Sequence, residues 1–110
     1  MSDIESELEL EAELAELRRR YARELPKKLD RLGELLSVAR ESGDRTGVDA
    51  AWQLAHSLKG SSGSYGFDQT SLELRRIEEC LASLLEKATL DVEAHWPVLA
   101  SAFANARAAI

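Results

Sequence analysis

Residues 21–44 read YARELPKKLDRLGELLSVARESGD, and apolar side chains recur in them every three or four positions. That interval places the apolar side chains on one face of a long helix. Pro26 is expected to kink or split this helix, because a proline ring clashes with the carbonyl four residues earlier. Gly43 is expected to end it. The apolar row also extends upstream and comprises Leu10, Leu14, Leu17, Tyr21, Leu25, Leu29, Leu32, Leu36 and Ala39.

A second helix is expected after the turn at Gly43. Thr46 and Asp49 have the spacing of a capping-box variant, in which two side chains three residues apart bond to free backbone N–H groups. Gly66 is placed to stop the helix in the left-handed conformation. The inward row of this helix is predicted to be Val48, Ala51, Trp52, Ala55, Leu58, Ser62 and Tyr65.

The rest of the sequence predicts two further helices. The first begins at Asp68, or at Thr70 with Glu73 as its capping-box partner. A short turn over residues 87–91 leads to the last helix, which begins near Ala94 or, with a kink at Pro97, one turn earlier. The predicted core positions are Leu74, Ile77, Leu81, Leu84 and Leu85, followed by Trp96, Leu99, Ala100, Phe103, Ala106 and Ile110. Because short turns join consecutive helices, we expect an all-α fold, an antiparallel up-and-down four-helix bundle.

Composition limits the classes of function. A chain of 110 residues, 45% hydrophobic and 31% charged, is long enough for one globular domain with a single core. The net charge of −6 argues against a nucleic-acid-binding surface. No apolar run approaches the roughly 18 residues that a membrane-spanning helix needs. With one cysteine, Cys80, and no signal-peptide pattern, the protein is expected to be cytoplasmic.

The beginning of the chain is strongly acidic. Glutamates occupy alternate positions from Glu5 to Glu13, and three arginines follow at residues 18–20. This order suits the N-terminal end of a helix and pairing between charges one turn apart. We interpret it as a solvated face, with a docking segment for a partner as the alternative. Residues 1–9 are assigned to an acidic N-terminal segment, and residues 10–110 to the bundle domain.

Residues 55–66, AHSLKGSSGSYG, place a histidine beside glycines on the second helix. Gly60 lies one turn after His56 and Gly63 one turn further, so neither position supplies a side chain that would cover the imidazole. Glycine in a helix costs about 0.5–1 kcal/mol relative to alanine, which suggests that another molecule approaches here. An exposed imidazole is mostly neutral at pH 7, and its free ring nitrogen is then a nucleophile. An ordinary surface histidine is the competing interpretation, and it is the one we adopt for His95.

The string AHSLKGSSGSYGF resembles the signature of the histidine phosphotransfer (HPt) domain family, in which Lys-Gly follows the histidine at +3 and +4. A further glycine lies at +10, here Gly66. Residues 21–44 are similar to the first long helix of that family. The sequence SLELRRIEECL is similar to the helix after the motif, with Glu78 near the usual acidic position. The resemblance covers residues from about 10 to 110.

The resemblance implies a phosphorelay carrier and not an enzyme. His56 would take a phosphoryl group from a phospho-aspartate of a receiver domain and pass it to another aspartate. Lys59 would neutralise part of the phosphoryl charge, and Gly60 would let the receiver approach. The other partner-binding residues are expected to be Asp49, Gln53, Ser57 and Gly63. The implied partners are response-regulator receiver domains and a hybrid histidine kinase, with no nucleic acid and no membrane, and the chain itself is expected to be a monomer.

No cofactor is expected on this chain, and Mg²⁺ would be supplied by the partner receiver domain. His56 has no carboxylate or second histidine one turn away, so a metal site on this helix is not expected. Nothing resembles a phosphate-cradling glycine loop, so the chain is not expected to be a kinase by itself. Two other functions stay open: an adaptor that binds receivers without chemistry, and a structural bundle that self-associates through its acidic N-terminal helix.

Overall fold

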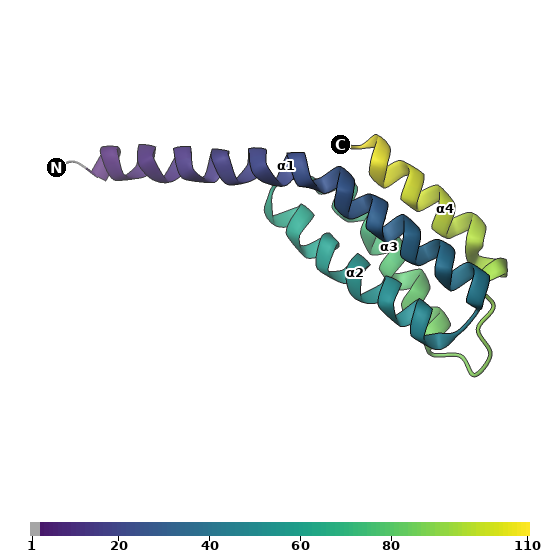
Figure 1. The fold of residues 1–110 in the computed structure, drawn as a ribbon. Helices are drawn as coiled ribbons and strands as arrows, with labels where there is room; N and C mark the ends of the chain where they lie inside the picture. The colour runs from purple at the N-terminus through teal and green to yellow at the C-terminus, as the bar shows by residue number, and fades with distance from the viewer. Residues whose placement is uncertain (1–2) are drawn as a thin grey trace.

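The computed structural model describes residues 3–110, and all regular structure within them is helical. Consecutive helices pack side by side in alternating directions, which confirms the predicted all-α bundle (Figure 1). The first and last helices are also in contact. The four helices are α1 (Asp3–Ser42), α2 (Arg45–Ser64), α3 (Asp68–Leu85) and α4 (Val92–Ala108).

The core lies where the apolar rows of the four helices meet. Burial of each large aliphatic side chain in it contributes about 1.5–3 kcal/mol. The predicted rows are largely confirmed, but not every member is buried. Partly buried members are Trp52, Tyr65, Leu85, Trp96, Ala100 and Phe103, and exposed members are Leu10, Leu14, Leu17 and Ile110. The buried apolar residues are Tyr21, Leu25, Leu29, Leu32, Leu36, Ala39, Val48, Ala51, Ala55, Leu58, Leu74, Ile77, Leu81, Leu84, Val92, Leu99, Ala102 and Ala106.

The first helix is continuous through Pro26, so of the two expected outcomes, a kink or a split, the split does not occur. Figure 1 shows instead that the axis of α1 changes direction where the helix joins the bundle. Leu25 and Leu29 on either side of the proline are fully buried. Their packing holds both parts of the helix on the same core, which offsets the lost backbone hydrogen bond.

Most of residues 3–20 of α1 project beyond the other three helices, and Leu17 and Arg20 lie beside Ser61 and Tyr65 at the end of α2 (Figure 1). None of residues 3–20 is buried, and the first buried residue of the helix is Tyr21. The projection gives the molecule extents of 63 × 23 × 18 Å. The predicted boundary between residues 9 and 10 lies inside α1, and residues 1–2 of the predicted acidic segment lie outside the described residues.

Both predicted capping boxes are wrong, although α3 begins at Asp68, one of its two expected starts. The side chain that caps α2 belongs to Asp44, whose Oδ1 accepts from the backbone N–H of Gly47 at 2.9 Å. Thr46 therefore lies inside the first turn and not at its start. Thr70 is buried inside α3, where its hydroxyl donates to the backbone carbonyl of Ala106 at 3.1 Å. A contact between helices thus replaces the predicted capping box.

Arginine side chains connect the helix ends at one end of the bundle through hydrogen bonds. Arg40 near the end of α1 makes two hydrogen bonds of 2.8 Å with Glu93 in the first turn of α4. Arg45 donates to the carbonyls of Leu85 and Lys87 at 2.5 and 2.6 Å, which satisfies carbonyl groups left free where α3 ends. These contacts hold the turns at one end of the bundle.

The glycines that were expected to end α1 and α2 do so in the left-handed conformation, with φ of +63° at Gly43 and +86° at Gly66. The last helix begins at Val92, capped by the Asp91 side chain, and contains Pro97. No helix within residues 3–110 combines the length and the apolar character needed to cross a bilayer.

Candidate functional site

His56 stands on the outer flank of α2, with 56% of its side chain exposed. One turn later, a Cβ built on Gly60 would meet no atom within 4 Å outside its own helix. The backbone beside the imidazole is therefore open to a neighbouring molecule. The sequence-based expectation of an accessible histidine beside bare backbone agrees with this geometry.

The imidazole ring lies flat against the indole of Trp52, one turn earlier on α2. Their ring centroids are 5.1 Å apart and their planes differ by 11°. Stacking of this kind restricts the rotation of an exposed ring. Trp52 thus supports one face of the imidazole and leaves the other free.

A carboxylate on α3 holds both the histidine and the nearby lysine. The Nδ1 atom of His56 lies 3.2 Å from Oε1 of Glu78, and Nζ of Lys59 lies 2.8 Å from Oε2 of the same side chain. Burial alone would raise the pKa of Glu78, but the hydrogen bonds and charges of Lys59 and His56 hold the pKa below its ordinary value. Glu78 is therefore ionised at neutral pH.

The ionised carboxylate fixes which ring nitrogen carries the proton. A carboxylate can only accept a hydrogen bond, so Nδ1 of His56 must donate to Glu78. In the neutral ring, Nε2 then keeps its lone pair. The contact with Glu78 therefore leaves Nε2 as the nucleophilic nitrogen of an exposed imidazole.

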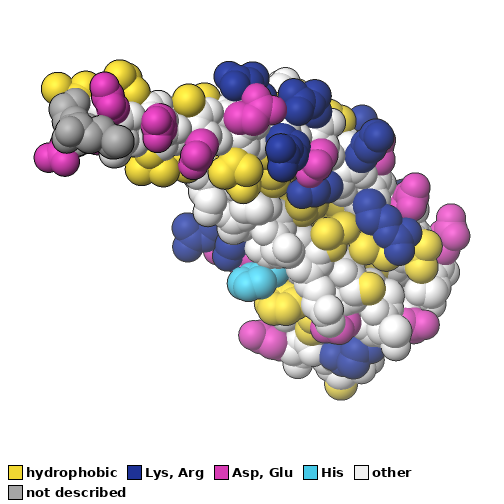
Figure 2. All heavy atoms as spheres, turned by 60° about the vertical axis from the view of Figure 1, so that its left-hand side comes forward, with side chains coloured by type: hydrophobic (Ala, Val, Ile, Leu, Met, Phe, Trp, Pro, Cys, Tyr) yellow, Lys and Arg dark blue, Asp and Glu magenta, His cyan; other side chains and the backbone are white. Residues whose placement is uncertain are grey.

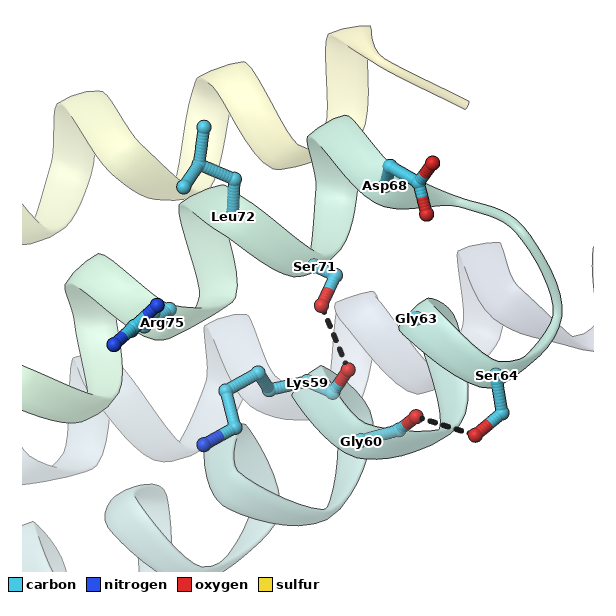
Figure 3. Close-up of a pocket in the computed structure, with 8 residues that line it drawn as sticks. All are labelled: Lys59, Gly60, Gly63, Ser64, Asp68, Ser71, Leu72 and Arg75. Atoms are coloured by element: carbon cyan, nitrogen blue, oxygen red, sulfur yellow. Dashed lines mark hydrogen bonds between the residues drawn. The ribbon is translucent and has the colours of Figure 1, made fainter.

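A shallow groove of about 470 Å³ runs between α2 and α3 beside this cluster (Figure 3). Lys59 and Arg75 both extend over one end of it. The groove is lined by Lys59, Gly60, Gly63, Ser64, Asp68, Ser71, Leu72 and Arg75. Two cationic side chains on neighbouring helices suit the approach of an anionic group to this side of the molecule.

Gly60 and Gly63 have different surroundings in this groove. A Cβ on Gly63 would lie 3.2 Å from Oγ of Ser71, whereas nothing approaches Gly60. The Ser71 hydroxyl donates to the backbone carbonyl of Lys59 at 2.8 Å (Figure 3). Gly63 thus permits close packing of α3 on α2, and Gly60 is the position that leaves backbone uncovered.

The sequence profile of the Hpt domain family matches residues 16–109. The chain belongs to the Hpt domain family. Neither curated proteins nor solved structures gave a significant match. Hpt domains are phosphocarrier modules, not kinases, and they act in phosphorelay signalling with receiver domains and kinases.

The partner-binding residues predicted for this Hpt domain fall along one side of α2. Asp49, Gln53, His56, Gly60 and Gly63 follow one another at intervals of four, three, four and three residues, which places them in one row on a helix. The Gln53 amide donates to the Asp49 carboxylate at 2.7 Å. Ser57 is exposed one residue after the histidine.

Sequence reasoning assigned no role to Glu78 and placed Trp52 in the inward row. The spacing within α2 could not reveal Glu78, which is 22 residues from His56 in the sequence and reaches it only because α3 packs on α2. Trp52 could have been recognised from its position one turn before the histidine. Within the described residues no three His, Cys, Asp or Glu side chains gather, so we assign no metal ligands here.

Proposed function

We propose that His56 of this Hpt domain accepts a phosphoryl group from a receiver-domain phospho-aspartate and donates it to the aspartate of another receiver. The Nε2 lone pair attacks phosphorus, and the bond between phosphorus and the aspartyl oxygen breaks with its electrons on the carboxylate. The imidazole becomes a positively charged phosphorylated ring that keeps its Nδ1 proton. Donation to the next aspartate reverses these steps.

The contact between His56 and Glu78 carries this proposal. A carboxylate at 3.2 Å from Nδ1 orients the ring and stabilises the positive charge that develops when Nε2 is phosphorylated. Phosphoryl transfer depends mainly on positioning and on charge stabilisation, so an open helical surface is sufficient on this side of the reaction.

Lys59 is proposed to neutralise part of the charge on the phosphoryl group. Its ammonium group is held by Glu78 at 2.8 Å on the same side of the molecule as the imidazole. Gly60 is proposed to admit the receiver's backbone, and Asp49, Gln53, Ser57 and Gly63 to contact the receiver around the histidine. Mg²⁺ is proposed to be contributed by the receiver.

Phosphorylation by a labelled receiver tests the acceptor. We expect His56→Gln to abolish transfer of label to this Hpt domain, because an amide cannot replace the imidazole nucleophile. The label on the unaltered protein should be acid-labile and base-stable, as expected of a phosphoramidate. His95→Gln is the matched control and should be labelled normally, since His95 lies on α4 with Nδ1 bonded to the Asp91 carbonyl.

Two outcomes would contradict the proposal. Label retained in His56→Gln would remove this residue from the acceptor role. Binding of a phosphorylated receiver with no transfer to the unaltered protein would support the adaptor function instead.

Lys59→Ala tests whether the Lys59 ammonium group neutralises part of the charge on the phosphoryl group. We expect the rate of phosphoryl transfer to fall about tenfold or more, because one charge-assisted contact to the phosphoryl group is worth about 1.5–3 kcal/mol. Rapid mixing with phosphorylated receiver measures that rate. Arg75→Ala removes a cation from the same groove without touching Glu78 and serves as the comparison. An unchanged rate in Lys59→Ala would exclude a neutralising role.

A further inference from the structure

The projecting part of α1 carries an apolar row that the bundle leaves exposed, although its last member, Leu17, lies beside Ser61 and Tyr65 at the end of α2. Leu10, Leu14 and Leu17 are 56%, 40% and 40% exposed. They are spaced by four and three residues, and Tyr21 and Leu25 continue the row into the core. The exposed row is therefore the extension of a buried one, on the same face of the same helix.

Charge is divided sharply along this projection. Residues 3–16 contain seven acidic side chains and neither lysine nor arginine, whereas arginines occupy positions 18, 19, 20 and 23. Figure 2 shows acidic side chains near the free end of the projection and basic ones gathered where it meets the bundle. Arg19 and Arg23 pair with Glu16. Within the described residues, Arg18 and Arg20 and the acidic side chains before residue 16 form no ion pair.

We propose that a second copy of this chain docks on this row, with the two projecting helices antiparallel. With Leu14 near the centre of the pair, Leu10 of each copy lies near Leu17 of the other. The six leucines then cover one another. Glu7 and Glu9 of each copy approach Arg18 and Arg20 of the other, so the acidic half of each projection faces the basic stretch of its partner.

Charge favours this orientation over a parallel one. Two parallel helices in register would place the acidic end of one chain against the acidic end of the other. They would also place each arginine against the same arginine of the other chain. Like charges in contact destabilise a helix pair, and opposite charges across the apolar row select the orientation. The antiparallel pair both covers the exposed leucines and places opposite charges against each other.

The dimer departs from the monomer expected from the sequence and agrees with the alternative left open there, self-association through the acidic N-terminal helix. That expectation treated residues 10–17 as part of the bundle, whereas the structure places them outside it. The proposal does not depend on the phosphoryl transfer at His56, because the row belongs to the projecting half of α1 and the proposed acceptor to α2.

Sedimentation velocity of the full chain over a range of concentrations tests the docking. We expect the unaltered protein to shift from monomer to dimer, and Leu14→Glu to raise the dimer Kd about tenfold or more, because it places a charge in the apolar row. Leu8→Glu is the matched control. Leu8 is also exposed, at 59%, but lies about 120° around the helix from Leu14. Its substitution should leave the Kd within about twofold.

Charge reversal tests the orientation. Glu7→Arg with Glu9→Arg should weaken self-association, as should Arg18→Glu with Arg20→Glu, because each change sets like charges opposite each other in an antiparallel pair. Combining all four substitutions in one chain should restore the dimer. In a parallel pair the combined variant would retain like charges at every position and would show no recovery.

Three results would overturn the proposal: a monomer at every concentration tested, a dimer that Leu8→Glu disrupts as strongly as Leu14→Glu, or failure of the combined charge reversal to recover the dimer. Circular dichroism of each variant establishes that the bundle remains folded, and phosphorylation by a labelled receiver tests the proposed function separately. A dimer that forms while phosphorylation fails would contradict only the proposed function.

Discussion

Glu78 on α3 contacts both His56 and Lys59 on α2, and both contacts depend on the negative charge of its carboxylate. The pKa of its carboxyl is below the ordinary value despite partial burial, because Lys59 and His56 favour the ionised form. A group whose pKa is lower in the folded than in the unfolded protein stabilises the fold above the unfolded pKa. That contribution disappears as the pH falls through the folded value.

We therefore expect the free-energy difference of unfolding between the unaltered protein and Glu78→Gln to depend on pH. At pH 7 the variant should be less stable by about 1–2 kcal/mol, since it loses a partly buried ion pair. Below about pH 4 the difference should shrink, because the carboxyl of the unaltered protein becomes protonated. Urea unfolding at several pH values measures it, with Glu79→Gln as the exposed neighbouring control. A difference that grew toward acid would contradict this account.

The residues on α2 could be predicted from sequence, but their partner on α3 could not. His56, Lys59 and Gly60 lie within five residues, so helical geometry alone fixes their relative positions. Glu78 joins them through the packing of two helices, and its role depends on which side of α3 faces α2. Similarity to a family indicated an acidic residue there without giving its contacts.

At the scale of the helix, the two glycines after His56 have separate consequences. Gly60 lies within α2 and has open space around it. A Cβ added to Gly63 would lie 3.2 Å from Oγ of Ser71. Gly60→Ala should stabilise the fold by about 0.5–1 kcal/mol, because alanine loses less backbone entropy in a helix. The same change should slow phosphoryl transfer, because the methyl group would cover backbone that we propose the receiver approaches.

Gly63→Ala is the matched comparison. Its methyl group must displace the Ser71 side chain, which donates to the Lys59 carbonyl, so the gain in helix propensity should be largely offset. Denaturant midpoints and transfer rates of the two variants separate the effects. Transfer in Gly60→Ala that is as fast as in the unaltered protein, or faster, would exclude Gly60 from the docking surface.

Helix positions were predictable from the sequence because the apolar rows repeat over many turns. The left-handed glycines also ended α1 and α2 as expected, since few other residues adopt a positive φ. Caps were less predictable, because several side chains near a helix start can each cap it. Asp44 caps α2 in place of Thr46, and Thr70 is drawn into the contact with α4.

At the scale of the molecule, the length of the projection was not predictable from periodicity. The apolar row runs without interruption from Leu10 to Ala39, and nothing in its spacing marks where the neighbouring helices end. That point depends on the lengths of α2 and α4, which stop beside the middle of α1 (Figure 1). The same row therefore contributes to the core in one half and to an exposed face in the other.

Removal of residues 1–15 tests this division of α1. The free energy of unfolding of the bundle should change by no more than about 0.5 kcal/mol at concentrations where the full chain is monomeric, because none of residues 3–15 is buried. The radius of gyration should fall from 16.9 Å toward about 13 Å, the value typical of a compact domain of this size. Urea unfolding and small-angle scattering measure the two quantities. A loss of several kcal/mol would mean that the projection folds back on the bundle in solution, and the apolar row would then be covered by its own chain instead of a second copy.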